Sequence, residues 1–254
     1  MIVYKSPEEI DRMRAAGRIV ANAIDLLLRA VRPGITTADL DRLAESHIRG
    51  EGAVPSFKGY RGFPATICTS LNEQVVHGIP GRRMLRQGDI LKLDVGAVWQ
   101  GYHADSAVSV FVDRAPSEQA ERLVKATEQA LDAGIAQIQA GARLSDIGHA
   151  VQVVAEEAGF SLVREYAGHG IGRALHEDPQ IPNYGDPGRG PLMREGLVVA
   201  VEPMVNVGDW RTRVLADKWT VVTADGSLSA HFEHTIAITA NGPEVLTARD
   251  ARAA

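Results

Sequence analysis

A pair of helices occurs twice in this chain, and the repeat limits the folds that the chain can adopt. The segments 33–52 (PGITTADLDRLAESHIRGEG) and 140–159 (AGARLSDIGHAVQVVAEEAG) match at a constant shift of 107 residues. A longer helix precedes each copy. The first of these helices is predicted to start at the capping box Ser6-Pro7-Glu8-Glu9 and to end at Arg32-Pro33-Gly34. The second is predicted to start near Pro116. The matched positions are Gly34 with Gly141, Asp39 with Asp146, Leu40 with Ile147, and Gly52 with Gly159.

The sequence between and after the helix pairs changes to a β pattern. Apolar residues alternate with others along 90–97 and again along 107–112, which predicts a hairpin with its turn at Gln100-Gly101. Three later segments, 196–205, 219–222 and 231–239, are rich in β-branched residues. The plan is therefore α-α-β-β, twice, in an α+β protein. We expect one catalytic domain, 1–254, with internal halves at about 1–112 and 113–254.

Charge and composition exclude several classes of protein. The net charge of −5 and a pI near 5.9 argue against a nucleic-acid-binding protein, which would show a basic face. The single cysteine, Cys68, rules out an internal disulfide framework. The N-terminus lacks a signal-peptide pattern, and the apolar run 24–28 is far shorter than a membrane span. We therefore expect a cytoplasmic protein with no membrane segment.

Two acids fall on the strands of the predicted hairpin. The spacing of Asp94 and Asp105 lets both carboxylates share one face, opposite the apolar residues of the first strand. Small neighbours such as Gly96 and Ala104 leave room for a cation between the strands. The alternative is that Asp94 belongs to the solvated side of a half-buried strand, with Lys92 beside it.

A histidine stands among alternating glycines in Gly168-His169-Gly170-Ile171-Gly172. Glycine permits close backbone approach, so His169 can be held in a crowded site. The pattern is not a dinucleotide fingerprint, because Arg173 occupies the place of the last glycine. His176, seven residues further on, is a candidate second imidazole that does not bind a metal. The alternative for His169 is an ordinary hydrogen-bonded histidine.

Two glutamates lie in or beside predicted strands. Glu202 ends the apolar run 196–201 and precedes Pro203, and Glu233 lies within 231–239. A carboxylate in such a place is costly to bury unless it meets a cation, although pairing with an arginine is an alternative for Glu202. Four ionised carboxylates in one pocket would repel, whereas two divalent cations balance them. Such ions activate water near neutral pH and polarise a carbonyl oxygen, as amide hydrolysis requires.

With these residues in place, the chain resembles the type I methionine aminopeptidases, which have the pita-bread fold. The resemblance is carried by 59–80 (GYRGFPATICTSLNEQVVHGIP), 91–107 (LKLDVGAVWQGYHADSA), 168–185 (GHGIGRALHEDPQIPNYG), 199–204 (VAVEPM) and 231–235 (HFEHT). It implies two halves related by a pseudo-twofold axis, with a central antiparallel sheet covered by helices. The metal ligands that it implies are Asp94, Asp105, His169, Glu202 and Glu233. The cofactors are two divalent ions, Co, Mn, Fe or Zn.

The resemblance also implies a substrate and a mechanism. The substrate is a nascent polypeptide whose initiator methionine precedes a small residue. Glu202 shuttles a proton, and His77 and His176 contact the scissile peptide and stabilise its developing charge. The family often has phenylalanine where Leu175 stands and cysteine where Val76 stands, so the detail of the pocket is open. The pocket for the methionine side chain comprises Phe57, Tyr60, Phe63, Cys68, Leu175 and Trp219.

Two other functions compete with this interpretation. A proline-directed (x-Pro) aminopeptidase of the same fold shares the ligands but usually carries an extra N-terminal domain, for which 1–52 is too short. A metal-free peptide-binding homologue would have no reason to keep four acids together. The chain is expected to be a monomer, and ribosome association is a further partner that the resemblance leaves open.

Overall fold

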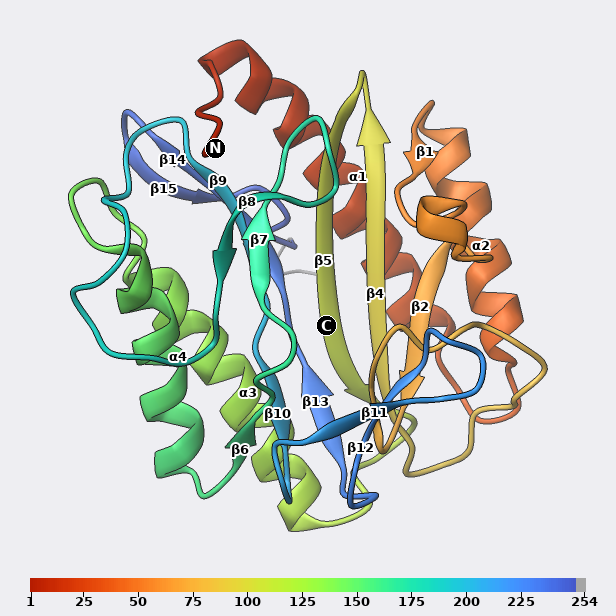
Figure 1. Cartoon of the computed structure of the whole chain (residues 1–254). Helices are drawn as coiled ribbons and strands as arrows, with labels where there is room; N and C mark the ends of the chain where they lie inside the picture. Colours follow the sequence, from red (N-terminus) through yellow and green to blue (C-terminus); the bar gives the residue numbers. More distant parts are fainter. Residues whose placement is uncertain (250–254) are drawn as a thin grey trace.

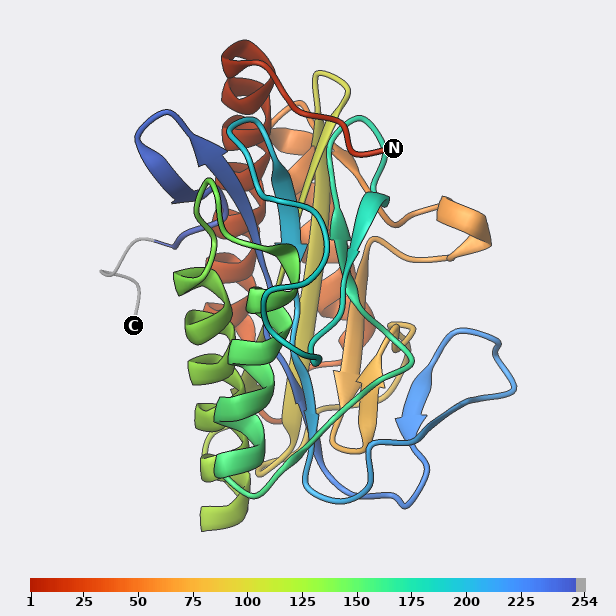
Figure 2. The same cartoon turned by 60° about the vertical axis from the view of Figure 1, so that its left-hand side comes forward.

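The computed structural model describes residues 1–249, which form an α+β fold. Antiparallel strands run through the middle of the molecule, with α1 behind β4 and β5, α2 at the right of Figure 1, and α3 and α4 at the left. Turned by 60°, α1, α3 and α4 lie behind one face of the strands, while two loops project from the other face (Figure 2). The helices are α1 (Pro7–Ala30), α2 (Thr37–Gly50), α3 (Glu118–Ala136) and α4 (Leu144–Glu157), with a short 3₁₀ turn, η1 (Tyr60–Gly62).

The starts of the helices follow the sequence predictions. The Ser6 hydroxyl accepts a hydrogen bond from the Glu9 amide at 3.3 Å, and the Glu9 carboxylate accepts one from the Ser6 amide at 2.9 Å. Thr36 and Asp39 form the same capping box before α2. The helix expected near Pro116 begins at Glu118 and is capped by Ser117. The second members of the two pairs, α2 and α4, have the same length of 14 residues.

The predicted hairpin is formed by β4 (Ile90–Trp99) and β5 (Tyr102–Phe111). Gln100 and Gly101 both have positive φ, 49° and 82°, as a two-residue hairpin turn of this hand requires. The register pairs Asp94 with Ala107 and Gly96 with Asp105. Directly opposite residues share a face, so both acids lie on the same side of the hairpin, as predicted.

The other face of β4 is the apolar one. Leu91, Leu93 and Val95 are fully buried in the main core, where they pack with residues of α1 and α2. Lys92 is also buried, and its ammonium donates to the carbonyl oxygens of Asn72 and Ser229 at 2.8 and 2.9 Å. The alternative of a solvated face is therefore wrong for Lys92, and Asp94 is half-buried.

Two of the later strands are interrupted where the sequence predicted continuous ones. Segment 196–205 forms β9 (Val198–Val201) and β10 (Met204–Asn206), and 231–239 forms β13 (Ser229–His231) and β14 (His234–Thr239). The breaks face each other, because β9 pairs with β14 while β10 pairs with β13. Pro203 has no amide hydrogen to continue the ladder. Glu233 is thus not inside a strand, and its amide donates to the Ala107 carbonyl of β5 at 2.9 Å.

The third predicted segment, 219–222, starts later than expected. The Asp217 carboxylate accepts hydrogen bonds from the amides of Trp219 and Thr220, so these residues belong to a turn and β12 begins at Val221. The other strands are β1 (Val54–Pro55), β2 (Ile67–Leu71), β3 (Gln74–Val76), β6 (Ser161–Leu162), β7 (Gly168–Gly170), β8 (Glu177–Ile181), β11 (Thr212–Val214), β12 (Val221–Thr223) and β15 (Gly242–Val245).

The strands form four sheets that together support the site. Their orders are β1-β4-β2 with β5 beside β4, then β15-β14-β9-β7-β8, β13-β10-β6 and β11-β12-β3. The bridge between Ala107 and Glu233 joins β5 to the segment between β13 and β14. The helix-helix-strand order occurs twice, and the boundary near residue 112 stays a prediction. Within the described residues, no helix is long and apolar enough to span a membrane.

Candidate metal centre and substrate pocket

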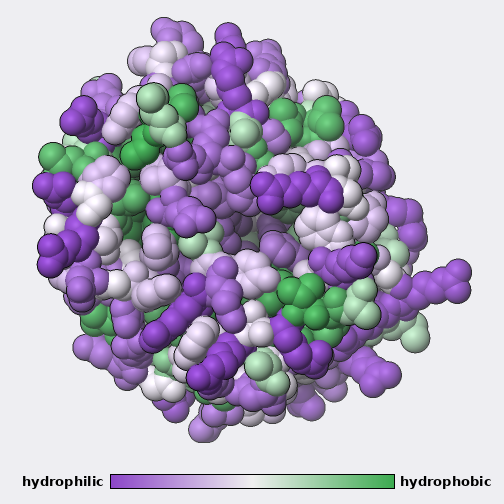
Figure 3. All heavy atoms as spheres, in the orientation of Figure 1, coloured by the Kyte–Doolittle hydropathy of each residue, from purple (hydrophilic) through white to green (hydrophobic). Residues whose placement is uncertain are grey.

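One pocket contains every side chain that the sequence proposed for the site. Five of these side chains are acids or histidines that could bind metal, two are further histidines, and six are apolar or aromatic. The space-filling view shows a hollow near the middle of a largely hydrophilic face (Figure 3). The pocket is lined by Phe57, Tyr60, Arg61, Phe63, Cys68, His77, Asp94, Asp105, His169, Leu175, His176, Glu202, Trp219 and Glu233.

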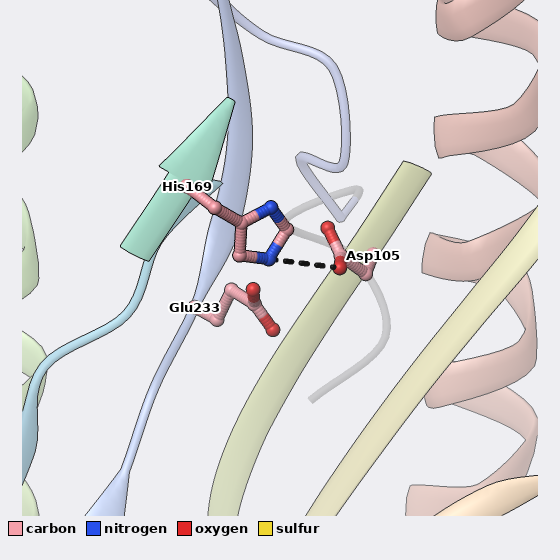
Figure 4. Close-up of side chains that lie close together, drawn as sticks. All are labelled: Asp105, His169 and Glu233. Atoms are coloured by element: carbon pink, nitrogen blue, oxygen red, sulfur yellow. Dashed lines mark ion pairs between the residues drawn. The ribbon is translucent and has the colours of Figure 1, made fainter. Parts of the chain in front are cut away.

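The centre of the pocket brings together side chains from three separate segments. Asp105 on β5, His169 on β7 and Glu233 before β14 each offer a ligand atom, and these atoms lie within 4.8 Å of one another (Figure 4). His169 Nε2 is 3.7 Å from Asp105 Oδ2 and 3.6 Å from Glu202 Oε1. Glu202 lies in the break between β9 and β10, and Glu233 lies in the break between β13 and β14. Because these two breaks face each other, both carboxylates lie at the centre of the pocket.

Asp94 adds a fourth carboxylate from the neighbouring strand β4. Its Oδ1 atom is buried and has no hydrogen-bond partner within the described part of the chain. A buried carboxylate oxygen without a donor is costly. A bound cation would remove that cost.

Burial raises the proton affinity of all four acids, and the charge of Asp105 adds to the effect at the other three. Burial raises the pKa of Asp94 to about 8, with the charge of Asp105 as the second cause. Burial also raises the pKa of Asp105, and it raises the pKa values of Glu202 and Glu233 well above their usual range, with Asp105 again the next cause. Without cations the cluster therefore holds protons near neutral pH. Cations would reverse this effect and keep the acids ionised.

The orientation of His169 also suits a metal. Its Nδ1 lies 2.9 Å from the Gly170 carbonyl oxygen, which can only accept, so the proton sits on Nδ1 and Nε2 presents its lone pair to the acids. Thr235 supports Asp105, since its hydroxyl donates to the Asp105 backbone carbonyl at 2.8 Å and lies 3.1 Å from Oδ1. This donor set of one imidazole and four carboxylates fits divalent cations such as Mn, Fe, Co or Zn.

Two more imidazoles border the metal ligand set. The ring centroid of His176 lies 4.2 Å from that of His169, and His176 Nδ1 is 2.9 Å from the Tyr60 hydroxyl. Loss of hydration lowers the pKa of His176 to about 3, with the neighbouring His169 as the next cause, although part of the ring is exposed. Burial lowers the pKa of His77 to about 4. Both rings are neutral at pH 7, and a neutral imidazole can donate one N–H to a developing oxyanion.

The remaining wall of the pocket is apolar. Phe57, Phe63, Cys68 and Leu175 are buried, and Phe63 meets Trp219 edge to face at 5.1 Å. Gly96 makes this packing possible, because a Cβ there would lie 2.7 Å from the Phe57 ring. Burial, followed by the charge of Asp94, raises the pKa of Cys68, so Cys68 is a neutral thiol. An apolar pocket lined with aromatic rings and sulfur suits a thioether.

Two further side chains near the centre, Arg61 and His231, were not predicted from the sequence. Arg61 lines the pocket and has a positive φ of 48°. His231 is buried, its Nε2 lies 3.6 Å from Glu202 Oε2, and neither ring nitrogen has a hydrogen-bond partner in residues 1–249. A signal for His231 was present in the sequence, because the predicted strand 231–239 places it two residues before Glu233 and therefore on the same face.

The fold and this site define a metallopeptidase. The model of metallopeptidase family M24 matches residues 11–240, and the chain belongs to that family. Within it, the chain groups with the methionine aminopeptidases. It is 51% identical to the methionine aminopeptidase of Clostridium acetobutylicum over 248 residues, covering 97% of this chain and 99% of the relative. The resemblance found in the sequence is thereby confirmed.

Solved structures agree with this assignment. The crystal structure of methionine aminopeptidase from Thermotoga maritima superposes with a TM-score of 0.96 at 47% identity, over 98% of this chain and 100% of that one. Prolidase from Pyrococcus furiosus has a TM-score of 0.78 at 20% identity, and the match covers 98% of this chain but 66% of that one. The second match shows only the shared pita-bread fold.

Proposed function

We propose that this enzyme removes the initiator methionine from nascent polypeptides whose second residue is small. The observation that carries the proposal is a single pocket in which a set of acids that could bind metal adjoins an apolar wall of aromatic rings and a thiol. The relatives at about half identity, named methionine aminopeptidase, support it. Methionine would occupy the compartment formed by Phe57, Tyr60, Phe63, Cys68, Leu175 and Trp219.

The acids and His169 would hold the metal. Asp94 and Asp105 would contribute carboxylates from the hairpin, and His169, Glu202 and Glu233 would complete a set for two divalent ions. The bound ions supply an activated water near neutral pH and polarise the scissile carbonyl. The identity of the ions, Co, Mn, Fe or Zn, is part of the proposal.

Protein side chains supply the proton transfers and the oxyanion donors. Glu202, whose carboxylate oxygens lie 3.6 Å from His169 Nε2 and 3.6 Å from His231 Nε2, would accept a proton and later deliver it to the leaving amine. His77 and His176, neutral at pH 7, would donate hydrogen bonds to the carbonyl oxygen as its negative charge develops. Tyr60 holds the His176 ring in place through its hydroxyl.

An assay with two kinds of peptide tests the proposal against its alternatives. Metal-free protein is incubated with Met-Ala-x and x-Pro peptides, each with and without Mn²⁺ or Co²⁺. Hydrolysis of Met-Ala-x only in the presence of metal supports the proposal. Hydrolysis of x-Pro peptides instead would indicate a proline-directed aminopeptidase. Inactivity on both, with metal present, would indicate a peptide-binding homologue.

The biological setting is also part of the proposal. The substrate is a nascent chain, so we place the enzyme in the cytoplasm, as a monomer that could meet its substrate at the ribosome. The acidic net charge of −5 is consistent with no direct binding to nucleic acid.

A further inference from the structure

A second groove continues from the catalytic pocket to the surface. It shares four side chains with that pocket, Arg61, His77, His176 and Glu202, and continues past Arg164 and Tyr184. The apolar compartment lies on the other side of the shared residues. If the proposed function holds, the substrate chain beyond the scissile bond must leave the pocket, and this groove adjoins the scissile position.

Arg164 is built into this groove in an unusual way. Its guanidinium carbon lies 5.3 Å from the ring centroid of Tyr184 and 5.4 Å from that of Trp210. Among residues 1–249 it makes no ion pair and no side-chain hydrogen bond. Stacking uses the faces of a guanidinium and leaves its N–H donors available at the edge. The two aromatic rings therefore hold the Arg164 guanidinium in place, and its N–H groups have no hydrogen-bond partner among residues 1–249.

A second arginine reinforces this character. The Arg61 guanidinium carbon lies 5.4 Å from the Tyr60 ring centroid, and Arg61 forms no ion pair and no side-chain hydrogen bond within residues 1–249. Glu165 on the outer part of the groove keeps its negative charge, and its carboxylate accepts hydrogen bonds from the amide and hydroxyl of Thr212 rather than from Arg164. Among residues 1–249, the two arginines that line the groove have no carboxylate partner, and they outnumber this acid.

We propose that this groove binds the substrate segment following the second residue, and that Arg164 and Arg61 favour acidic side chains in it. The inference rests on the proposed function and adds a preference for substrate charge. An Arg–carboxylate pair can be bidentate, which a neutral side chain cannot match. A lysine in the same segment would be repelled by both arginines.

Peptides that differ in one charge test the proposal. The manganese-loaded enzyme is given Met-Ala-Ala-Ala-Ala amide, and versions with Glu or Lys at the third, fourth or fifth position. At low salt we expect kcat/KM for the best-placed Glu peptide to exceed its Lys counterpart by about tenfold, mainly through KM. The preference should shrink in about 0.5 M salt, because exposed charges are screened.

Variants assign the effect to the groove. Arg164→Glu should abolish or invert the preference, and Arg164→Gln and Arg61→Gln should each weaken it. Both Arg164 variants should keep hydrolysing the neutral peptide, and the circular dichroism spectrum and melting temperature of all three variants show whether they are folded. The matched control is Lys125→Glu, which makes the same charge change on the exposed surface of α3 and should leave the preference unchanged.

The outcomes separate the two proposals. Equal rates for Glu and Lys peptides in the unmodified enzyme overturn the charge preference and leave the aminopeptidase function intact. A preference that survives both Arg164→Glu and Arg61→Gln assigns the effect to other residues and overturns it too. Failure to cleave every peptide, with metal present, overturns the proposed function and this inference with it.

Discussion

In the absence of divalent cations, the free energy of unfolding of this protein should fall as the pH rises from about 6.5 to about 8. Burial raises the pKa of Asp94 to about 8, and burial also raises the pKa values of Glu202 and Glu233 well above their usual range. In the unfolded chain these carboxyls ionise near pH 4. In this interval the folded state therefore binds more protons than the unfolded state. For each additional bound proton, the free energy of unfolding falls by about 1.4 kcal/mol per pH unit.

Other buried groups change the size of the effect but not its sign. Burial lowers the pKa values of His77 and His231 to about 4 and about 3. These histidines therefore reduce the free energy of unfolding only below about pH 6.5, where they are protonated in the unfolded chain but still neutral in the folded one. Burial lowers the pKa of Lys92 to about 7, which makes stability rise with pH above that value. Asp94 by itself offsets Lys92, and the raised pKa values of Glu202 and Glu233 act in the same direction as Asp94. We therefore expect a net loss on the order of 1 kcal/mol or more across the interval.

Urea unfolding followed by circular dichroism measures this loss. Chelator-treated protein is unfolded at several pH values across the interval, and parallel samples receive Mn²⁺, which should flatten the dependence by keeping the acids ionised. Asp94→Asn should reduce the slope in the metal-free protein, whereas Asp132→Asn, on the exposed surface of α3, should not. A metal-free stability that stays level or rises between pH 6.5 and pH 8 would refute the electrostatic account of the cluster.

Three substitutions probe the chemistry and the pocket. Glu202→Gln should lower kcat by roughly 10²–10⁴-fold while the protein stays folded, and near-normal turnover would exclude Glu202 as the proton shuttle. His176→Ala should lower kcat by about 10²–10³-fold, the usual cost of losing an oxyanion donor, and an unchanged kcat would remove His176 from the mechanism. Gly96→Ala should raise KM for methionyl peptides and cost about 1–3 kcal/mol of stability, because its Cβ would meet the Phe57 ring at 2.7 Å. Gly50→Ala, whose Cβ would meet nothing within 4 Å, is the matched control, and equal effects of the two alanines would contradict the packing argument.

Local signals predicted the elements that depend on local contacts. The capping boxes at Ser6 and Thr36 and the Gln100-Gly101 turn involve residues close in sequence, so their chemistry can be read without the rest of the fold. The shared face of Asp94 and Asp105 followed from strand alternation and the hairpin register. The resemblance to a known family added the remaining residues of the pocket, which local patterns alone left open.

Tertiary contacts decided what the local pattern could not show. Segments 196–205 and 231–239 have continuous β patterns, yet each breaks where its pairing partner changes, and the breaks carry Glu202 and Glu233 to the centre.

The sequence by itself determined which side chains could bind metal, the repeated helix pair and the family. Only the tertiary structure decided that His231 lies against Glu202, that Lys92 is buried, and that Arg164 is held between Tyr184 and Trp210. These contacts join residues far apart in the chain. Their existence depends on the packing of whole sheets and loops, which no local window of sequence contains.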